Sequence, residues 1–142
     1  MMPFAVQRLD HVVLRVADLA RSRRFYLDVL GCRVERERPD LGLLHLRAGA
    51  SLIDLVDTDG PLGRRGGAGP GAEGRNLDHL CLRIEPFDEA AILAHLARFG
   101  LAAEEPASRK FGAEGSGLSL YLRDPDGNVV ELKGPADTPA ST

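Results

Sequence analysis

Eight residues of this chain occur twice in nearly the same form. The segment LDHVVLRV at 9–16 returns as LDHLCLRI at 77–84, with five of the eight positions identical. Their histidines, His11 and His79, lie 79 − 11 = 68 residues apart in a chain of 142. A repeat of this period indicates two copies of one supersecondary unit, each with a histidine at the same place.

The bulk composition excludes several classes of protein. A net charge of −3 gives no support for a nucleic-acid partner or a membrane surface. No apolar run is long enough to span a bilayer, and the start of the chain lacks the basic and apolar regions of a signal peptide. The two cysteines have no metal-ligand spacing and fit reduced thiols. We therefore expect a cytoplasmic protein that binds neither nucleic acid nor membrane.

Each half of the chain predicts the element order βαβββ. Strands are expected at 8–16, 32–38, 42–48 and 51–56, and again at 77–85, 102–105, 117–124 and 128–133. Asp18 and Asp88 are candidate N-caps of the two helices, and Gly31 and Gly100 are their stop signals. In the second helix, Phe99 is expected to complete the buried stripe formed with Ile92 and Leu96.

These elements predict one domain over residues 8–133, with module one at 8–56 and module two at 77–133. A glycine-rich linker joins them at 57–76, and its apolar content is too low to fold alone. A lid role is the alternative for this linker, because long loops are often functional. Residues 134–142 are expected to form a flexible tail.

Strand alternation predicts which side chains share a face. With the aliphatic positions under the helices, four residues share the opposite face: His11, Asp54, His79 and Glu131. Two imidazoles and a carboxylate on one concave face form a facial metal site with open positions. The alternative is that each residue only ends a solvated strand, which the matching positions in the two modules disfavour.

Three segments resemble the vicinal oxygen chelate superfamily: the paired LDH strands, FYLDVLG at 25–31 and YLRDPDGNVVE at 121–131. That superfamily includes glyoxalase I, fosfomycin-resistance thiol transferases, methylmalonyl-CoA epimerase, extradiol dioxygenases and bleomycin-binding proteins. The resemblance covers 8–133. It implies an α+β fold in which two βαβββ modules form a curled mixed sheet, a cup around a divalent metal with the helices on its outer face.

By motif position, the resemblance implies His11, His79 and Glu131 as metal ligands, with Zn, Ni, Mn or Fe as the metal. The fourth glyoxalase position is usually glutamate and here holds Asp54, one methylene shorter. A divalent cation acts as a Lewis acid on two neighbouring substrate oxygens. A carboxylate beside it moves a proton between adjacent carbons. We therefore expect Asp54 and Glu131 to be the catalytic carboxylates, with Asp54 as the general base. A surface acid at a strand end is the alternative for Asp54.

Four further residues are candidate substrate contacts. Arg15 and Arg83 each lie two residues beyond a histidine, and their guanidinium groups suit an anionic substrate. A place at the cup rim or in a subunit contact is an equal alternative for both. His45 and Tyr121 share the same face, where simple lining of the cavity is the alternative.

The predicted function is therefore a divalent-metal-dependent, glyoxalase-like enzyme of lyase or isomerase type that acts on a small anionic molecule. The alternatives are a thiol transferase with a thiol co-substrate, a dioxygenase, or a non-enzymatic antibiotic-binding protein. Residues 112–116 lack the further histidine of ring-cleaving dioxygenases, which disfavours that chemistry. The resemblance also implies a homodimer, an arrangement that covers open sheet edges.

Overall fold

The computed structural model describes residues 1–139. The chain divides into two compact units, unit 1 (Met1–Pro70) and unit 2 (Gly71–Thr142). Their boundary lies inside the linker that the sequence predicts at 57–76.

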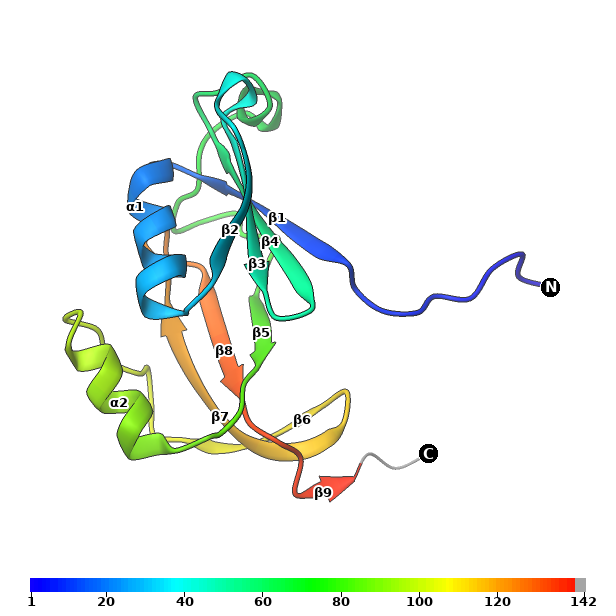
Figure 1. The fold of residues 1–142 in the computed structure, drawn as a ribbon, viewed down its shortest axis with the longest axis vertical. Coiled ribbons are helices and arrows are strands. Elements are labelled where there is room, and N and C mark those ends of the chain that lie inside the picture. Colours follow the sequence, from blue (N-terminus) through cyan, green and yellow to red (C-terminus); the bar gives the residue numbers. More distant parts are fainter. Residues whose placement is uncertain (140–142) are drawn as a thin grey trace. The chain divides into compact units, whose positions relative to one another are not determined.

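Unit 1 holds a mixed sheet of four strands in the order β1-β4-β3-β2 (Figure 1). Its elements are β1 (His11–Val16), α1 (Leu19–Arg24), β2 (Arg33–Arg38), β3 (Leu43–Ala48) and β4 (Ser51–Asp57). β1 and β4 are parallel, while β3 is antiparallel to both of its neighbours. A parallel pair needs a long crossover connection, which α1, β2 and β3 provide here.

Unit 2 repeats this arrangement in the order β5-β8-β7-β6. Its elements are β5 (His79–Arg83), α2 (Glu89–Ala97), β6 (Ser108–Gly112), β7 (Gly115–Arg123), β8 (Val129–Lys133) and β9 (Thr138–Pro139). β5 and β8 form the parallel pair, and β9 adds to β7. β9 lies within the tail that the sequence predicts as flexible, while residues 140–142 of that tail lie outside the described part of the chain.

The register of the parallel pair is the same in both units. The histidine of the first strand lies opposite a residue two positions before the acid of the last strand. These trios are His11, Leu52 and Asp54 in unit 1 and His79, Val129 and Glu131 in unit 2. The α+β class with two βαβββ modules is therefore confirmed, and the repeat in the sequence is a repeat of topology.

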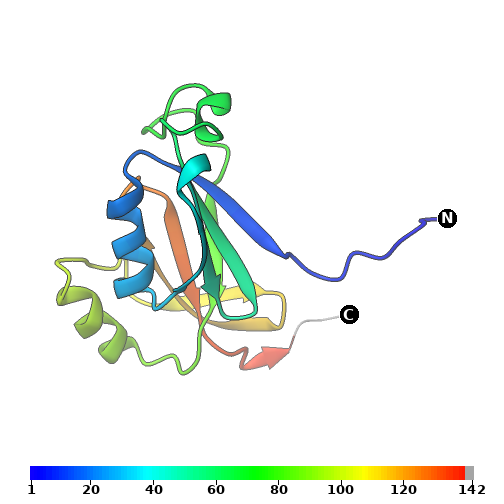
Figure 2. The ribbon, with the colours of Figure 1, turned by 45° about the horizontal axis from the view of Figure 1, so that its top comes forward.

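Both helices begin where the sequence predicts. Asp18 accepts a hydrogen bond from the backbone N–H of Arg21 at 3.0 Å, and Asp88 accepts one from Ala91 at 3.1 Å. These side chains satisfy N–H groups that have no partner within the helix. After α1 the chain makes a π-helical turn at Phe25–Val29. Figure 2 shows α1 beside the sheet of unit 1, where it contacts β4.

The core of each unit consists of aliphatic side chains on alternate strand positions, as the alternation predicts. The fully buried large residues of unit 1 are Val16, Tyr26, Leu46, Ile53 and Leu55. Those of unit 2 are Leu96, Leu120, Leu122 and Val130. In both units the opposite sheet face is thereby left for polar side chains.

Two expectations for unit 2 are wrong. Phe99 is 42% exposed, because α2 ends at Ala97 and the ring lies in the following turn against His95. No strand forms at 102–105, where the N–H of Glu104 donates to Tyr121 O at 2.8 Å and its carboxylate accepts from Arg123 at 2.6 Å. The strand lies instead at β6, and its pairing with β7 decides the position.

The glycine-rich linker is ordered by one side chain of unit 1. The guanidinium of Arg15 donates to the backbone carbonyls of Gly63 at 2.8 and 3.1 Å, Gly67 at 2.6 Å and Ala68 at 3.0 Å. Gly63 begins a 3-10 turn, Gly63–Gly66. These charge-assisted bonds explain how a segment with few apolar residues holds a defined path.

None of the helices in the described part of the chain has both the length and the apolar character needed to cross a bilayer.

Candidate functional site

The two repeated histidines are each held by the aspartate that precedes them. Nδ1 of His11 lies 2.8 Å from Oδ2 of Asp10, and Nδ1 of His79 lies 2.7 Å from Oδ2 of Asp78. We assign the ring proton to Nδ1 in both, because a carboxylate can only accept. The lone pair then lies on Nε2, as in carboxylate–histidine–metal arrangements. The hydrogen bond that His11 donates to Asp10 raises the pKa of His11 above its usual value.

In unit 2 the free ring nitrogen of His79 meets a buried carboxylate. Nε2 lies 3.1 Å from Oε1 of Glu131, whose residue is only 5% exposed. The hydroxyl of Ser119 donates to the other oxygen, Oε2, at 2.7 Å. With its proton on Nδ1, Nε2 of His79 cannot donate to Oε1, so Ser119 alone orients the carboxylate and the two facing lone pairs are left for a cation. An imidazole nitrogen and a carboxylate oxygen that face each other are two ligands of a divalent transition metal.

Two weakly acidic side chains surround the same carboxylate. Cys81 and Tyr121 lie directly opposite Glu131 on the two neighbouring strands. Burial raises the pKa of the Cys81 thiol to about 11, and the charge of Glu131 adds to the rise. Burial and a hydrogen bond with Glu131 raise the pKa of Tyr121 to about 12. At neutral pH both groups are therefore protonated, and each has a proton to donate.

Three of these side chains, His79, Cys81 and Glu131, line a cavity in unit 2 of about 380 Å³. Its lining residues come from β5, β6, β8 and the β6–β7 turn: His79, Cys81, Arg83, Phe111, Gly112, Ala113, Glu114, Glu131 and Lys133. A volume of this size accommodates a small molecule. The cavity therefore brings the predicted ligands of unit 2 and a possible substrate to the same place.

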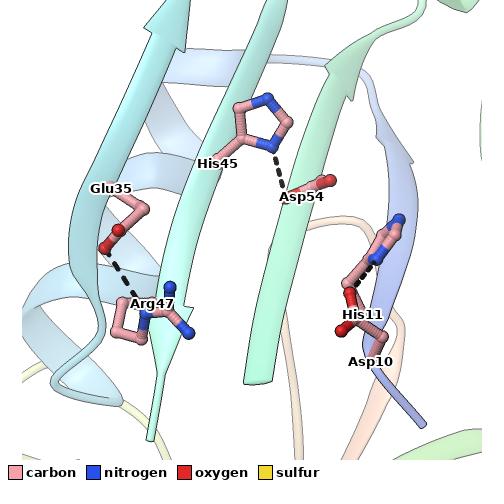
Figure 3. A network of polar contacts seen from close by, with 6 residues as sticks. All are labelled: Asp10, His11, Glu35, His45, Arg47 and Asp54. Carbon is pink, nitrogen blue, oxygen red and sulfur yellow. Dashed lines mark hydrogen bonds and ion pairs between the residues drawn. The ribbon is translucent and has the colours of Figure 1, made fainter. Parts of the chain in front are cut away.

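Unit 1 carries a second acid–base pair at the corresponding position. Figure 3 shows His11, His45 and Asp54 on three neighbouring strands of the unit 1 sheet. Nδ1 of His45 lies 2.9 Å from Oδ1 of Asp54, which is 4% exposed. Neither atom is in hydrogen-bond geometry with any residue of the described chain. A buried carboxylate with an unsatisfied oxygen is available to accept a proton.

The two repeat-related arginines have protein partners. The guanidinium of Arg15 donates to the linker carbonyls, so its role in this structure is to hold the linker. Arg83 lines the cavity, but its Nε donates to Glu114 at 2.6 Å and its terminal nitrogens donate to Glu85 at 3.0 Å and to the Ile84 carbonyl at 2.6 Å. Those acids raise the pKa of Arg83 still further above its ordinary value.

No three side chains of His, Cys, Asp or Glu gather closely enough within residues 1–139 to hold a metal ion. Unit 2 by itself supplies two suitable donors, His79 and Glu131, and unit 1 supplies His11. The chemistry of these donors fits a divalent transition metal, because imidazole nitrogen and carboxylate oxygen are both ligands of such ions. Their assignment as ligands stays a prediction.

Four residues near these groups have no role in the predictions made from the sequence. Asp10 and Asp78 orient the histidines, and the signal for them was the repeat of LDH rather than of histidine alone. Ser119 shares its strand face with Tyr121, so alternation did place it beside Glu131. Lys133 follows Glu131 by two positions, but no motif distinguishes it from a solvated strand end.

Comparison with known proteins gives the family. The model of the Glyoxalase/Bleomycin resistance protein/Dioxygenase superfamily matches residues 8–132. The chain belongs to this superfamily. The resemblance drawn from the paired LDH strands and the DPDGN ending is therefore confirmed.

Within the superfamily, similarity extends along most of the chain. It is 28% identical over 130 residues to virulence protein STM3117 of Salmonella typhimurium, across 89% of this chain and 83% of that protein. It is 26% identical over 134 residues to the mitochondrial methylmalonyl-CoA epimerase of Homo sapiens, across 89% and 73%. The crystal structure of STM3117 superposes with a TM-score of 0.73 at 26% identity, over 92% of this chain and 98% of that one.

A further structure shares the fold alone. Lactoylglutathione lyase from Agrobacterium tumefaciens superposes with a TM-score of 0.64 at 21% identity, over 94% of this chain and 96% of that chain. The superfamily fold is thus common to proteins with different names and activities, and function has to be argued from the site.

Proposed function

We propose that this protein is a divalent-metal-dependent enzyme of the glyoxalase type, a lyase or isomerase that binds two neighbouring oxygens of a small anionic substrate. One observation carries the proposal. The repeated Asp-His pairs present Nε2 of each imidazole, and Nε2 of His79 lies 3.1 Å from the buried Glu131. Such outer-sphere carboxylates are typical of metal-binding histidines.

In this proposal His11, His79 and Glu131 bind the metal. The ion, when bound, polarises the substrate oxygens as a Lewis acid. Asp78 and Asp10 hold the ring planes and fix the tautomer, and Ser119 holds the Glu131 carboxylate. The chain's own part is therefore to present two neutral imidazoles and one anionic oxygen without further rearrangement.

Asp54 is the proposed general base. Its carboxylate is buried and has an unsatisfied oxygen beside His45, so it has a site free to accept a proton and a neighbour to pass it to. Tyr121 is protonated over the whole physiological range and hydrogen-bonds with Glu131. It is the proposed donor to a substrate oxygen once its hydroxyl turns away from that carboxylate. Similarity to an epimerase supports proton transfer as the reaction class.

The direct test is the metal content of the full chain, purified without a histidine tag. We expect close to one divalent ion per chain by plasma mass spectrometry, and its loss in His11→Ala, His79→Ala and Glu131→Ala. His95→Ala is the matched control, because His95 lies on α2, packed against Phe99. A wild-type protein without metal even after reconstitution would favour a non-enzymatic binding protein; retention of the ion by both His11→Ala and Glu131→Ala would refute the ligands.

Turnover separates the glyoxalase type from its relatives. The metal-loaded protein is assayed first with the glutathione hemithioacetal, then with small anionic compounds selected by thermal shift. Asp54→Asn is expected to keep the metal and to lose turnover of whichever compound is active. Loss of the ion in Asp54→Asn would instead make this residue a ligand.

A finer prediction concerns the residue before each histidine. Asp78→Asn keeps the size of the side chain but lets the amide compete for the Nδ1 contact, so the ring loses its fixed tautomer. We expect metal affinity to fall about 10- to 100-fold, the usual cost of losing an outer-shell partner. Titration with a chromophoric chelator measures it, with Asp126→Asn in the same unit as the comparison. Unchanged affinity in Asp78→Asn would remove this aspartate from the site.

A further inference from the structure

The cavity of unit 2 is lined by a lysine that has no carboxylate as an ion-pair partner. Lys133 is 6% exposed and lines the cavity together with Glu131 and His79. No acidic side chain of residues 1–139 forms an ion pair with its ammonium group. The side-chain stem of Lys133 is buried, but its ammonium nitrogen is not fully buried. A cation that faces a cavity without an acidic partner attracts an anion.

The acids that share the cavity already have other partners. Glu114 accepts from Arg83 at 2.6 Å. Glu131 contacts Nε2 of His79 at 3.1 Å and accepts from Ser119 at 2.7 Å. Lys133 therefore has no counter-ion among the described residues.

A second cation lies beside it. Lys133 on β8 is the direct register partner of Arg83 on β5, and like charges on neighbouring strands repel. Glu114 and Glu85 compensate the charge of Arg83, but no corresponding pair compensates that of Lys133. An anion in the cavity would supply the missing charge.

Two glycines leave room for the lysine side chain. A Cβ on Gly112 would lie 2.6 Å from Cε of Lys133, and one on Gly117 would lie 3.2 Å from its Nζ. Neither glycine has a positive φ, so the backbone itself does not require glycine at these positions. Gly117 also passes close to the carbonyl of Pro135. At Gly112 the only close obstacle to a side chain is Lys133 itself.

We propose that Lys133 binds a carboxylate or phosphate group of a ligand in the unit 2 cavity. A lysine ammonium is a compact point charge that suits either oxyanion. Because His79 and Glu131 line the same cavity, the bound anion would be part of the substrate, next to its reacting carbons. As a statement about the substrate this rests on the proposed function, but anion binding by Lys133 requires no metal.

The test uses the full chain stripped of metal and titrated calorimetrically with malonate and, separately, with inorganic phosphate. We expect binding that weakens by about tenfold or more in Lys133→Met, the order of effect for loss of a buried charge partner. Arg98→Met is the matched control, because Arg98 is an exposed cation of unit 2 that does not line the cavity. We expect its affinity to stay within about twofold of wild type. Preference for malonate or phosphate then distinguishes a carboxylate from a phosphate ligand.

A second variant guards against misfolding of the first. Gly112→Ala meets only the flexible end of Lys133, so it should fold, displace the ammonium and weaken anion binding. Absence of anion binding by the wild type, or equal affinity in wild type, Lys133→Met and Gly112→Ala, would overturn the proposal. If the wild type binds anions through Lys133 but never binds metal, the proposed function fails and this inference stands. If the wild type binds metal but binds anions independently of Lys133, this inference fails and the proposed function stands.

Discussion

Glu131→Gln is expected to abolish metal binding while leaving the fold intact. The amide has the same shape as the carboxylate, and its oxygen can still accept from Ser119, but the negative charge beside Nε2 of His79 is gone. Because Glu131 is a proposed direct ligand, the loss of affinity should exceed the about 10- to 100-fold typical of an outer-shell partner. Metal titration measures it, and circular dichroism checks the fold.

The same variant has a second readout that does not need the metal. The thiol of Cys81, with a pKa of about 11, is mostly protonated at pH 8, and Glu131 contributes to that rise. Removing the charge lowers the pKa, so more thiolate is present at pH 8 and alkylation is faster. We expect Cys81 in the metal-free Glu131→Gln chain to react faster with iodoacetamide than in metal-free wild type. Slower alkylation, or intact metal binding, would contradict the role given to Glu131.

Gly63→Ala is expected to destabilise unit 1 strongly. An added Cβ would lie 1.8 Å from the carbonyl oxygen of Asp57 and 2.7 Å from Cα of Thr58, both of them backbone atoms. The turn therefore has to shift, which also displaces the carbonyl that accepts two bonds from Arg15. Overpacking of this kind costs about 1–3 kcal/mol, and the lost hydrogen bonds add to it.

The matched control for this prediction is Gly71→Ala. A Cβ at Gly71 meets no atom within 4 Å, and the residue is exposed, so its stability should stay within about 0.5 kcal/mol of wild type. Both variants change the unfolded chain alike, and their difference isolates the clash. Urea unfolding, with hydrogen exchange over 57–68, gives the comparison. Equal stability of the two variants would mean that the Gly63 turn is not rigid.

The sequence alone determined the topology and which side chains share a strand face. The repeated LDH strands and the alternation of aliphatic residues were sufficient because strand period and module order are local properties. They predicted the two βαβββ modules, the helix caps at Asp18 and Asp88, and the shared face of His79, Glu131 and Tyr121. The position of β6 was missed because its pairing with β7, rather than its own composition, decides where it lies.

Only the tertiary structure decided what each polar side chain contacts. Arg15 and Arg83 have equivalent positions in the repeat, yet one holds linker carbonyls and the other binds two acids at a cavity. Lys133 ends a strand in the sequence but is buried in the fold without a partner. These differences depend on residues more than thirty positions away, such as Gly63 for Arg15 and Glu114 for Arg83. A local pattern specifies the face of a strand, whereas the partner on that face comes from chain segments that only folding brings together.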